Sequence, residues 1–278
     1  MTCVDEILIS INETKTGSLS RLPAWDGALY AANTGHHRVY DAAFLDPLPL
    51  TATDVVLDLG CGSGDFTTVV AERAREVVGL EPQPSLLAEA RRRARPNQRF
   101  VNGTVQELGA LFPEDGQFDV VMTRAVLQWV PLADHPPLLA DVFRLLRPGG
   151  RFRAEFGGAG NIARARRLLD EVSVALGGPA SPWTFPDEGV YLELVERAGF
   201  DLGHGFLRLV PQRRSFDRES LLGWFHSQIV QAYTVGMDAP TAELFTGEVL
   251  ARFDELARWD GSFDQTYVRM DLLVRRPS

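Results

Sequence analysis

Cysteine and lysine are almost missing from this sequence. The two cysteines, Cys3 and Cys61, are too few for a disulfide framework and argue against a metal site built from cysteine ligands. Lys15 is the only lysine among 28 basic residues, so arginine carries nearly all of the positive charge. We attribute this bias to genomic composition and assign it no mechanistic meaning.

Long apolar runs and an excess of basic charge are missing as well. No run of about 18 apolar residues occurs, which argues against a membrane-spanning helix. The formal net charge is −9, so the basic footprint that nucleic acids and anionic membranes require is lacking. Asp5 and Glu6 stand where a signal peptide would be basic and then apolar, so none is expected. We therefore expect a cytoplasmic protein, monomer or homodimer, that acts on a small molecule.

Short apolar runs and helical patterns alternate over the first 160 residues. This alternation predicts an α/β fold, with a doubly wound parallel sheet and right-handed crossovers. One helix is expected to open at Ser85 and another to span 136–147. The ligand should bind at the carboxyl ends of the strands. The predicted strands are 54–59, 76–81, 99–104, 118–124 and 151–156.

The C-terminal part departs from this alternation. Helices are predicted over 161–176 and 187–198, and strands over 201–210 and 265–276. A mostly helical stretch separates the two strands, and so long an insertion is typical of a lid or binding element. The predicted division is a flexible N-terminus at 1–24, a core with an N-terminal lid helix at 25–212, a helical insertion at 213–262 and a final core strand at 263–278.

The loop after the first predicted strand contains three glycines at alternate positions, Gly60, Gly62 and Gly64. It lacks the Gly-Lys-Ser/Thr ending of a phosphate-binding P-loop. It also departs from the dinucleotide fingerprint, because Asp65 occupies the third glycine position. A carboxylate at the start of the following helix would repel a pyrophosphate. The loop therefore predicts a nucleotide-like ligand without phosphates.

Several segments together resemble the class I S-adenosylmethionine-dependent methyltransferases. They are DLGCGSG at 58–64, Glu81 within GLEPQPSLL, RPGGRF at 147–152, AVLQWVP at 125–131 and AEFGGAGN at 154–161. The last two narrow the resemblance to bacterial small-molecule methyltransferases, of which the trans-aconitate methyltransferases are one type. The resemblance implies a Rossmann-like seven-stranded sheet with flanking helices, in which the last strand is antiparallel.

The resemblance also implies a cofactor site for S-adenosylmethionine. The glycines let the backbone approach the cofactor, Asp58 accepts from its ammonium directly or through water, and Glu81 grips both ribose hydroxyls. Thr104 stands where the family commonly has an acid for the adenine amino group, and a hydroxyl accepts more weakly than a carboxylate. The complete predicted cofactor site is Asp58, Gly60, Cys61, Gly62, Gly64, Glu81, Pro82, Thr104, Val105, Arg124, Gln128 and Trp129.

The acceptor site is less clearly marked in the sequence. A general base is needed only if the acceptor must lose a proton. The catalytic candidates are His36 and His37 under the expected lid helix, Glu155 as base or anchor, and Arg124 as a bidentate ligand for a substrate carboxylate. Trp183, Trp224 and His226 would line an apolar acceptor pocket, unless they belong to the core.

These observations predict a methyltransferase for a small-molecule acceptor, with secondary metabolism as one setting. A protein that binds the cofactor but catalyses another reaction, such as a cyclisation, or acts as a binding module stays open, because the loop reports binding and not transfer. A dinucleotide oxidoreductase is disfavoured by Asp65. Nucleic-acid methylation is disfavoured because TRAVLQW replaces the base-flipping motif after the fourth strand. No metal is expected.

Overall fold

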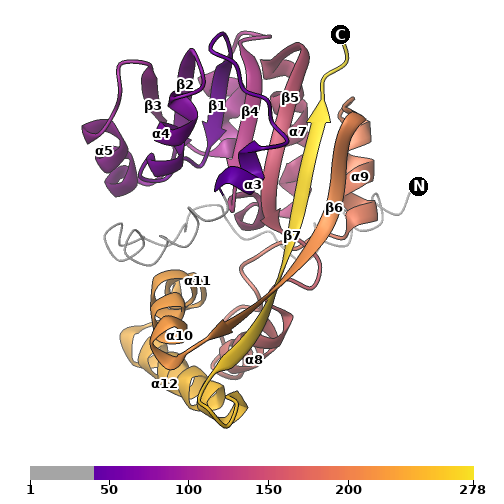
Figure 1. The fold of residues 1–278 in the computed structure, drawn as a ribbon. Coiled ribbons are helices and arrows are strands. Elements are labelled where there is room, and N and C mark those ends of the chain that lie inside the picture. Colours follow the sequence, from indigo (N-terminus) through magenta and orange to yellow (C-terminus); the bar gives the residue numbers. More distant parts are fainter. Residues whose placement is uncertain (1–40) are drawn as a thin grey trace.

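A computed structural model describes residues 41–278, in which a seven-stranded sheet is the central element (Figure 1). The strand order is β3-β2-β1-β4-β5-β7-β6. The first five strands are parallel, and β7 runs antiparallel to both β5 and β6, which confirms the predicted fold class. The strands are β1 Val55–Leu59, β2 Glu76–Glu81, β3 Gln98–Asn102, β4 Phe118–Arg124, β5 Leu146–Gly157, β6 Asp201–Phe216 and β7 Phe263–Arg275.

Helices cover both faces of the sheet. Side chains of β1 show the two layers: Leu57 belongs to the core shared with α7 and α9, while Val56 packs with the core of α3 and α4. Buried on both faces, these strands are continuous apolar runs, as parallel strands require. The first layer contains α6 Leu108–Leu111, α7 His135–Leu145 and α9 Glu188–Arg197, and the second α3 Asp41–Leu45, α4 Asp65–Ala71 and α5 Pro84–Arg92. Short 3₁₀ segments span Val105–Glu107, Leu127–Trp129 and Leu132–Asp134.

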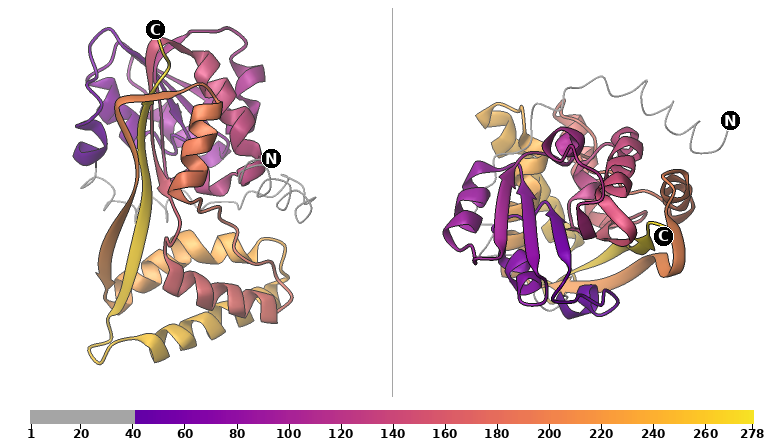
Figure 2. Two further views of the ribbon diagram at one scale, coloured as in Figure 1. Left: turned by 90° about the vertical axis from the view of Figure 1, so that its right-hand side faces the viewer. Right: turned by 90° about the horizontal axis from the view of Figure 1, so that it is seen from above.

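A helical lobe lies beyond the end of the sheet, and Figures 1 and 2 show the long β6 and β7 reaching into it. We define this lobe by α8 Ala163–Ala175, α10 Arg218–Trp224, the π-helix Phe225–Ile229, α11 Val230–Thr234 and α12 Ala239–Leu256. It has its own aromatic core, in which Tyr233 stacks on Phe245 with ring centroids 5.5 Å apart. None of the described helices is both long enough and apolar enough to span a membrane.

Two local predictions differ from the structure. Strand β6 extends to Phe216, although the polar segment after Val210 was not expected to be a strand. Its ladder with β7 continues from Pro211 opposite Val268 to Phe216 opposite Phe263. A proline is tolerated there because β6 is the edge strand of the sheet. Helix α5 begins at Pro84 after Gln83, so the expected N-cap at Ser85 is wrong; proline suits the first helical position.

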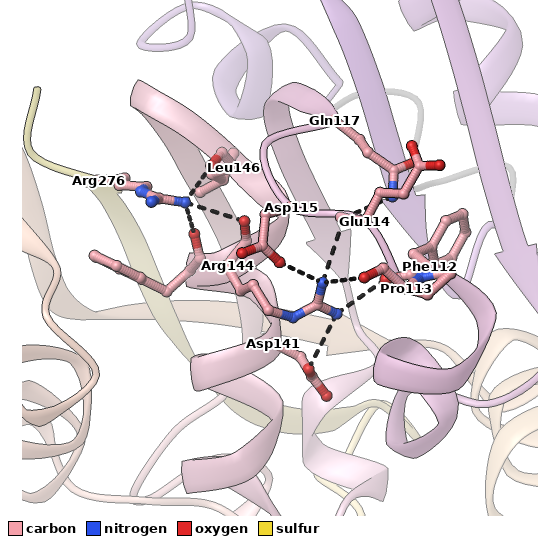
Figure 3. Close-up of polar contacts among 10 residues, drawn as sticks. Phe112, Pro113, Glu114, Asp115, Gln117, Asp141, Arg144, Leu146 and Arg276 are labelled. Atoms are coloured by element: carbon pink, nitrogen blue, oxygen red, sulfur yellow. Dashed lines mark hydrogen bonds and ion pairs between the residues drawn. The ribbon is translucent and has the colours of Figure 1, made fainter.

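Arg144 and Arg276 donate hydrogen bonds to backbone carbonyls at the end of the molecule away from the strands' carboxyl ends (Figure 3). Arg276, just after β7, donates to the carbonyls of Phe143, Arg144 and Leu146 at 3.1, 3.0 and 2.7 Å. The carbonyls of Phe143 and Arg144 belong to the end of α7, where no intrahelical donor reaches them, and Leu146 begins β5. Arg144 in turn donates to the Phe112 carbonyl at 2.9 Å. The last strand is thereby attached to α7, and α7 to the loop that precedes β4.

Candidate functional site

A cavity opens at the carboxyl ends of the central strands, between the sheet and the helical lobe. Its floor comes from the ends of β1, β2, β3 and β4, as expected for a ligand site in an open α/β sheet. Its other side is formed by the lobe and by β7. The residues that line it from the sheet side include Gly60, Gly62, Glu81, Pro82, Thr104, Val105, Arg124, Gln128 and Trp129, nine of the twelve predicted cofactor residues.

The glycine loop presents its backbone to this cavity. Gly60 and Gly62 have φ of +70° and +57°, in the left-handed region that glycine adopts without strain. The amides of Gly60 and Cys61 donate to the Leu80 carbonyl at 2.8 and 3.0 Å, which fixes the loop on the end of β2. A Cβ on Gly60 would lie 2.2 Å from a methyl of Val126, whereas one on Gly62 would meet nothing within 4 Å. The loop therefore leaves open space where a ligand can approach the main chain.

Glu81 ends β2 with a carboxylate that is held by backbone donors. Oε2 accepts from the amide of Gly62 at 3.0 Å, and Oε1 accepts from the amide of Gln83 at 2.9 Å. Burial raises the pKa of this carboxyl, and the two amides offset part of the effect. Since each carboxylate oxygen has two acceptor positions, one on each remains available. Two acceptors side by side fit a vicinal diol.

Three predicted cofactor residues, Asp58, Cys61 and Gly64, are absent from the cavity lining. Asp58 accepts a hydrogen bond from the Thr67 hydroxyl of α4 at 2.7 Å, and burial raises its pKa to about 7. The Cys61 side chain is buried with α5 and Phe100. Gly64 lies beneath α5, where a Cβ would come 3.1 Å from that of Ala90. These three residues therefore contact α4 and α5 and support the glycine loop.

The third strand leads into the part of the cavity where the predicted adenine contact lies. The backbone amide of Thr104 donates to Glu107 Oε2 at 2.7 Å, and its hydroxyl donates to the same oxygen at 2.9 Å. With its proton so engaged, the Thr104 oxygen keeps its lone pairs for an incoming donor. Val105 is nearly fully buried and offers an apolar surface beside it. Gln106, not singled out from the sequence, also lines this part.

Arg124 lines the cavity at the end of β4, but its guanidinium already has partners. Nη1 lies 2.6 Å from Oδ1 of Asp41, the first residue of α3. The same group lies 4.4 Å from the ring centre of Phe66 and 5.1 Å from that of Phe44. The guanidinium that was predicted to bind a substrate carboxylate is therefore paired with Asp41 in this structure.

Gln128 and Trp129 connect the sheet to the opposite wall. The side-chain oxygen of Gln128 accepts from the amide of Gly157 at 3.3 Å, and its carbonyl accepts from the amide of Thr184 at 2.8 Å. Trp129 meets Trp183 edge to face with ring centroids 5.7 Å apart. Both residues line the cavity.

The structure does not place the other catalytic candidates in the cavity lining. His36 and His37 lie outside the described residues. Glu155 is half-buried in β5, where its carbonyl accepts from the amide of Ala125 at 2.7 Å, and it is absent from the cavity lining. Trp183 and Trp224 both line the cavity and both belong to the aromatic core. A place in the core and a place in the pocket wall are therefore compatible for these residues. His226 does not line it.

Several lining residues were missed because they come from β7 and the lobe. They are Asn161, Ile162, Phe185, Gln228, Ile229, Tyr267 and Arg269. One backbone signal marks this wall: Ala125 and Ile162 have φ of +55° and +45°, the only positive values among the described non-glycine residues. Such strain concentrates at ligand sites. Both residues line the cavity.

The lining chemistry fits S-adenosylmethionine. The loop leaves open space beside Gly62, Glu81 has acceptors for a diol, and Thr104 has lone pairs for an amino group. Asp65 opens α4 with a carboxylate, which would repel a phosphate at that helix start. Among the described residues, no group of three or more metal-ligating side chains occurs.

Comparisons with known proteins agree with this assignment. A family described as a methyltransferase domain matches residues 56–150. The chain is 35% identical over 270 residues to a trans-aconitate 2-methyltransferase of Variovorax paradoxus, covering 91% of this chain and 98% of that protein. A trans-aconitate 2-methyltransferase of Deinococcus radiodurans is 32% identical over 215 residues, or 71% and 79% of the two chains. YcgJ of Bacillus subtilis shares the fold, with a TM-score of 0.63 at 14% identity over 87% of this chain and 100% of its own.

Proposed function

We propose a small-molecule acceptor for this protein, which belongs to the class I S-adenosylmethionine-dependent methyltransferases. The observation that carries the proposal is the aromatic wall opposite the cofactor loop. Trp183, Trp224 and Tyr267 are each at most 8% exposed and line the cavity from the lobe side. A cavity walled by buried aromatic side chains suits a small organic acceptor.

The relatives and the charge support the same proposal. Two relatives carry the name of a small acid, trans-aconitate, in their descriptions. The net charge of −9 disfavours a nucleic-acid acceptor. We extend the proposal to a cytoplasmic enzyme, monomer or homodimer, for which secondary metabolism is one setting.

The chain's own groups would position two reactants. Bound S-adenosylmethionine supplies a reactive methyl group on a sulfonium, so the protein mainly orients the acceptor and excludes water. Glu81 would hold the ribose hydroxyls, and Thr104 would hold the adenine amino group. Asp58 would serve the ammonium through a water, because it is absent from the cavity lining. The aromatic wall shields the reacting atoms from solvent.

Four residues remain candidates for direct action on the acceptor. We propose His36 or His37 as general base for an acceptor that must lose a proton. Arg124 is proposed as a ligand for a substrate carboxylate, a role that requires its guanidinium to exchange Asp41 for the substrate. Glu155 is proposed as an anchor, and a movement of its side chain toward the cavity is required for that role.

The test is the production of S-adenosylhomocysteine. The full chain is incubated with methyl-labelled cofactor and separate panels of small carboxylic acids, phenols and amines, with duplex DNA and transfer RNA as comparison acceptors. We expect label transfer and S-adenosylhomocysteine with at least one small molecule and with neither nucleic acid. Saturable cofactor binding without product from any acceptor would instead favour a non-methylating function.

A further inference from the structure

Two donor side chains on residues that line the cavity, Arg269 and Gln228, have no hydrogen-bond acceptor among residues 41–278. The first is the guanidinium of Arg269 on β7, a residue paired with Gly157 of β5. Its one contact in the described part of the chain is with the ring of Tyr267, 5.2 Å from the ring centre. No ion pair or hydrogen bond joins this guanidinium to any residue from 41 to 278.

The charged groups around Arg269 do not compensate it. Glu155 lies diagonally from it across the β5–β7 ladder and attracts its charge without forming an ion pair. Arg124 and Arg214 repel it, and enclosure by the protein lowers its pKa below the ordinary value. A cation enclosed without a counter-ion is costly, and native proteins rarely leave one uncompensated. An anionic ligand would supply the missing counter-charge.

The second donor is the side-chain amide of Gln228. Its Nε2 is buried and has no acceptor among the described residues, although Gln228 lines the same cavity. The residue lies in the π-helix Phe225–Ile229, and single π turns inside helices are frequent at functional sites. The π turn thus places a second unsatisfied donor on the wall that holds Arg269.

The rest of this wall is apolar. Trp183 and Phe185 stack with ring centroids 6.0 Å apart and planes 16° from parallel. Trp224, Ile162 and Ile229 continue the wall and are buried. A ligand bound by Arg269 would therefore rest its remaining atoms on aromatic and aliphatic surface.

The number of available charges limits the ligand further. In the described chain, the lining residues that carry a charge at neutral pH are Glu81, Arg124 and Arg269. Glu81 belongs to the cofactor end, and Arg124 is neutralised by Asp41. One uncompensated cation remains, which matches one carboxylate. A tricarboxylate such as trans-aconitate would leave two carboxylates without a cation in this part of the chain.

We propose that the acceptor is an amphipathic monocarboxylate, whose carboxylate is bound by Arg269 and Gln228 and whose apolar body packs against the aromatic wall. This inference rests on the proposed function and narrows its substrate class. The fork of a guanidinium binds a carboxylate through two parallel hydrogen bonds. Gln228 supplies a third donor from the lobe.

Binding is tested with phenylacetate, its neutral analogue phenylacetamide and trans-aconitate, on the full chain saturated with S-adenosylhomocysteine. Quenching of Trp183 and Trp224 fluorescence reports occupancy of the wall. We expect phenylacetate to bind at least about tenfold more tightly than phenylacetamide, the effect of a charged hydrogen bond, and more tightly than trans-aconitate. Failure of phenylacetate to bind, or tighter binding of trans-aconitate, overturns the proposal.

Variants then assign the effect to the two donors. Arg269→Gln is expected to abolish the preference for acid over amide while leaving affinity for S-adenosylhomocysteine unchanged, and Gln228→Leu is expected to reduce the preference. Arg275→Gln, an exposed arginine on the same strand, is the matched control and should change neither. An unchanged preference in Arg269→Gln overturns the assignment.

Two further measurements show whether Arg269 has a structural role and whether the anion site depends on the methyltransferase proposal. Since Arg269 has no ion-pair partner among residues 41–278, Arg269→Gln should melt at or above the wild-type temperature, and a lower melting temperature would indicate a structural role instead. If the carboxylate binds as expected but no acceptor yields S-adenosylhomocysteine, the methyltransferase proposal fails and the anion site stands.

Discussion

Arg124 and Asp41 form an ion pair, with Nη1 of the arginine 2.6 Å from Oδ1 of the aspartate. The pair joins the end of β4 to the start of α3, and its side chains are only 12% and 17% exposed. Arg124 lines the cavity, and the ion pair engages the guanidinium that was predicted from the sequence to bind a substrate carboxylate. Neutralising Asp41 therefore tests both the stability of the rim and the availability of Arg124.

Asp41→Asn should lower the free energy of unfolding by about 1–3 kcal/mol, because a largely buried guanidinium loses its charged acceptor. The measurement is urea denaturation at low and high salt. The control is Asp46→Asn, an exposed aspartate beyond the same helix with no ion pair among the described residues. Equal midpoints for the two variants would contradict the prediction.

Gly60→Ala and Gly62→Ala form a matched pair that separates packing from ligand access. Both place a side chain at positive φ, which costs about 1 kcal/mol each. Only the Gly60 variant adds a clash, with Val126, so its total loss should reach about 2–4 kcal/mol. Gly62→Ala should mainly weaken binding of S-adenosylhomocysteine, measured by calorimetry. A larger loss of stability in Gly62→Ala would count against this geometry.

Glu81→Gln should weaken binding of S-adenosylhomocysteine at least about tenfold, equivalent to the loss of one charged hydrogen bond. In the wild type, the Glu81 carboxylate accepts hydrogen bonds from the backbone N–H groups of Gly62 and Gln83. The side-chain NH₂ of the new glutamine would face one of these N–H groups, so that hydrogen bond is lost. A fall of about 1–2 kcal/mol in apo stability is therefore expected. Glu114→Gln, at an exposed glutamate, serves as control. Unchanged affinity in Glu81→Gln would remove this residue from the ribose site.

Asp58 should make stability depend on pH. Burial raises its pKa from 3.8 to about 7, so the folded protein holds this proton more tightly than the unfolded chain does. Its contribution to stability therefore falls as pH rises from 3.8 to 7 and is constant above. Asp58→Asn keeps an acceptor for Thr67 and removes this loss.

The measurement for Asp58 is the melting temperature of variant and wild type between pH 4 and pH 8. The difference in favour of Asp58→Asn should grow up to about pH 7 and then level off. Glu243→Gln, at an exposed acid on α12, should give a flat difference over the same range. A flat difference for Asp58→Asn would mean that its pKa is ordinary.

Local sequence patterns were sufficient to predict the parallel strands of the sheet and the lining residues on the sheet side of the cavity. Strands β2 and β4 have the predicted bounds, because a parallel strand buried on both faces is a continuous apolar run that ends at a polar residue. Gly60 and Gly62 follow the end of β1, and Glu81 is the last residue of β2, so the parallel strands bring them together at one edge of the sheet. Asp58 was harder to orient, because a run buried on both faces does not show which way each side chain points.

The acceptor wall could not be predicted in the same way. Arg269 is one arginine in an alternating strand, and Gln228 is one polar residue in a helix, so neither carries a local signal. Their meeting depends on the β6–β7 ladder, which extends far beyond the segment that looked like a strand. It also depends on a π turn, which the sequence pattern did not reveal.

The sequence by itself determined the fold class and the methyl donor, because both depend on short-range features: apolar runs, a glycine loop and acids at strand ends. The tertiary structure decided which charges are still available. Pairing of Arg124 with Asp41 and the isolation of Arg269 are properties of residues distant in the chain. Whether a partly buried cation has a counter-ion depends on contacts that only folding brings together, and among residues 41–278 folding brings none to Arg269.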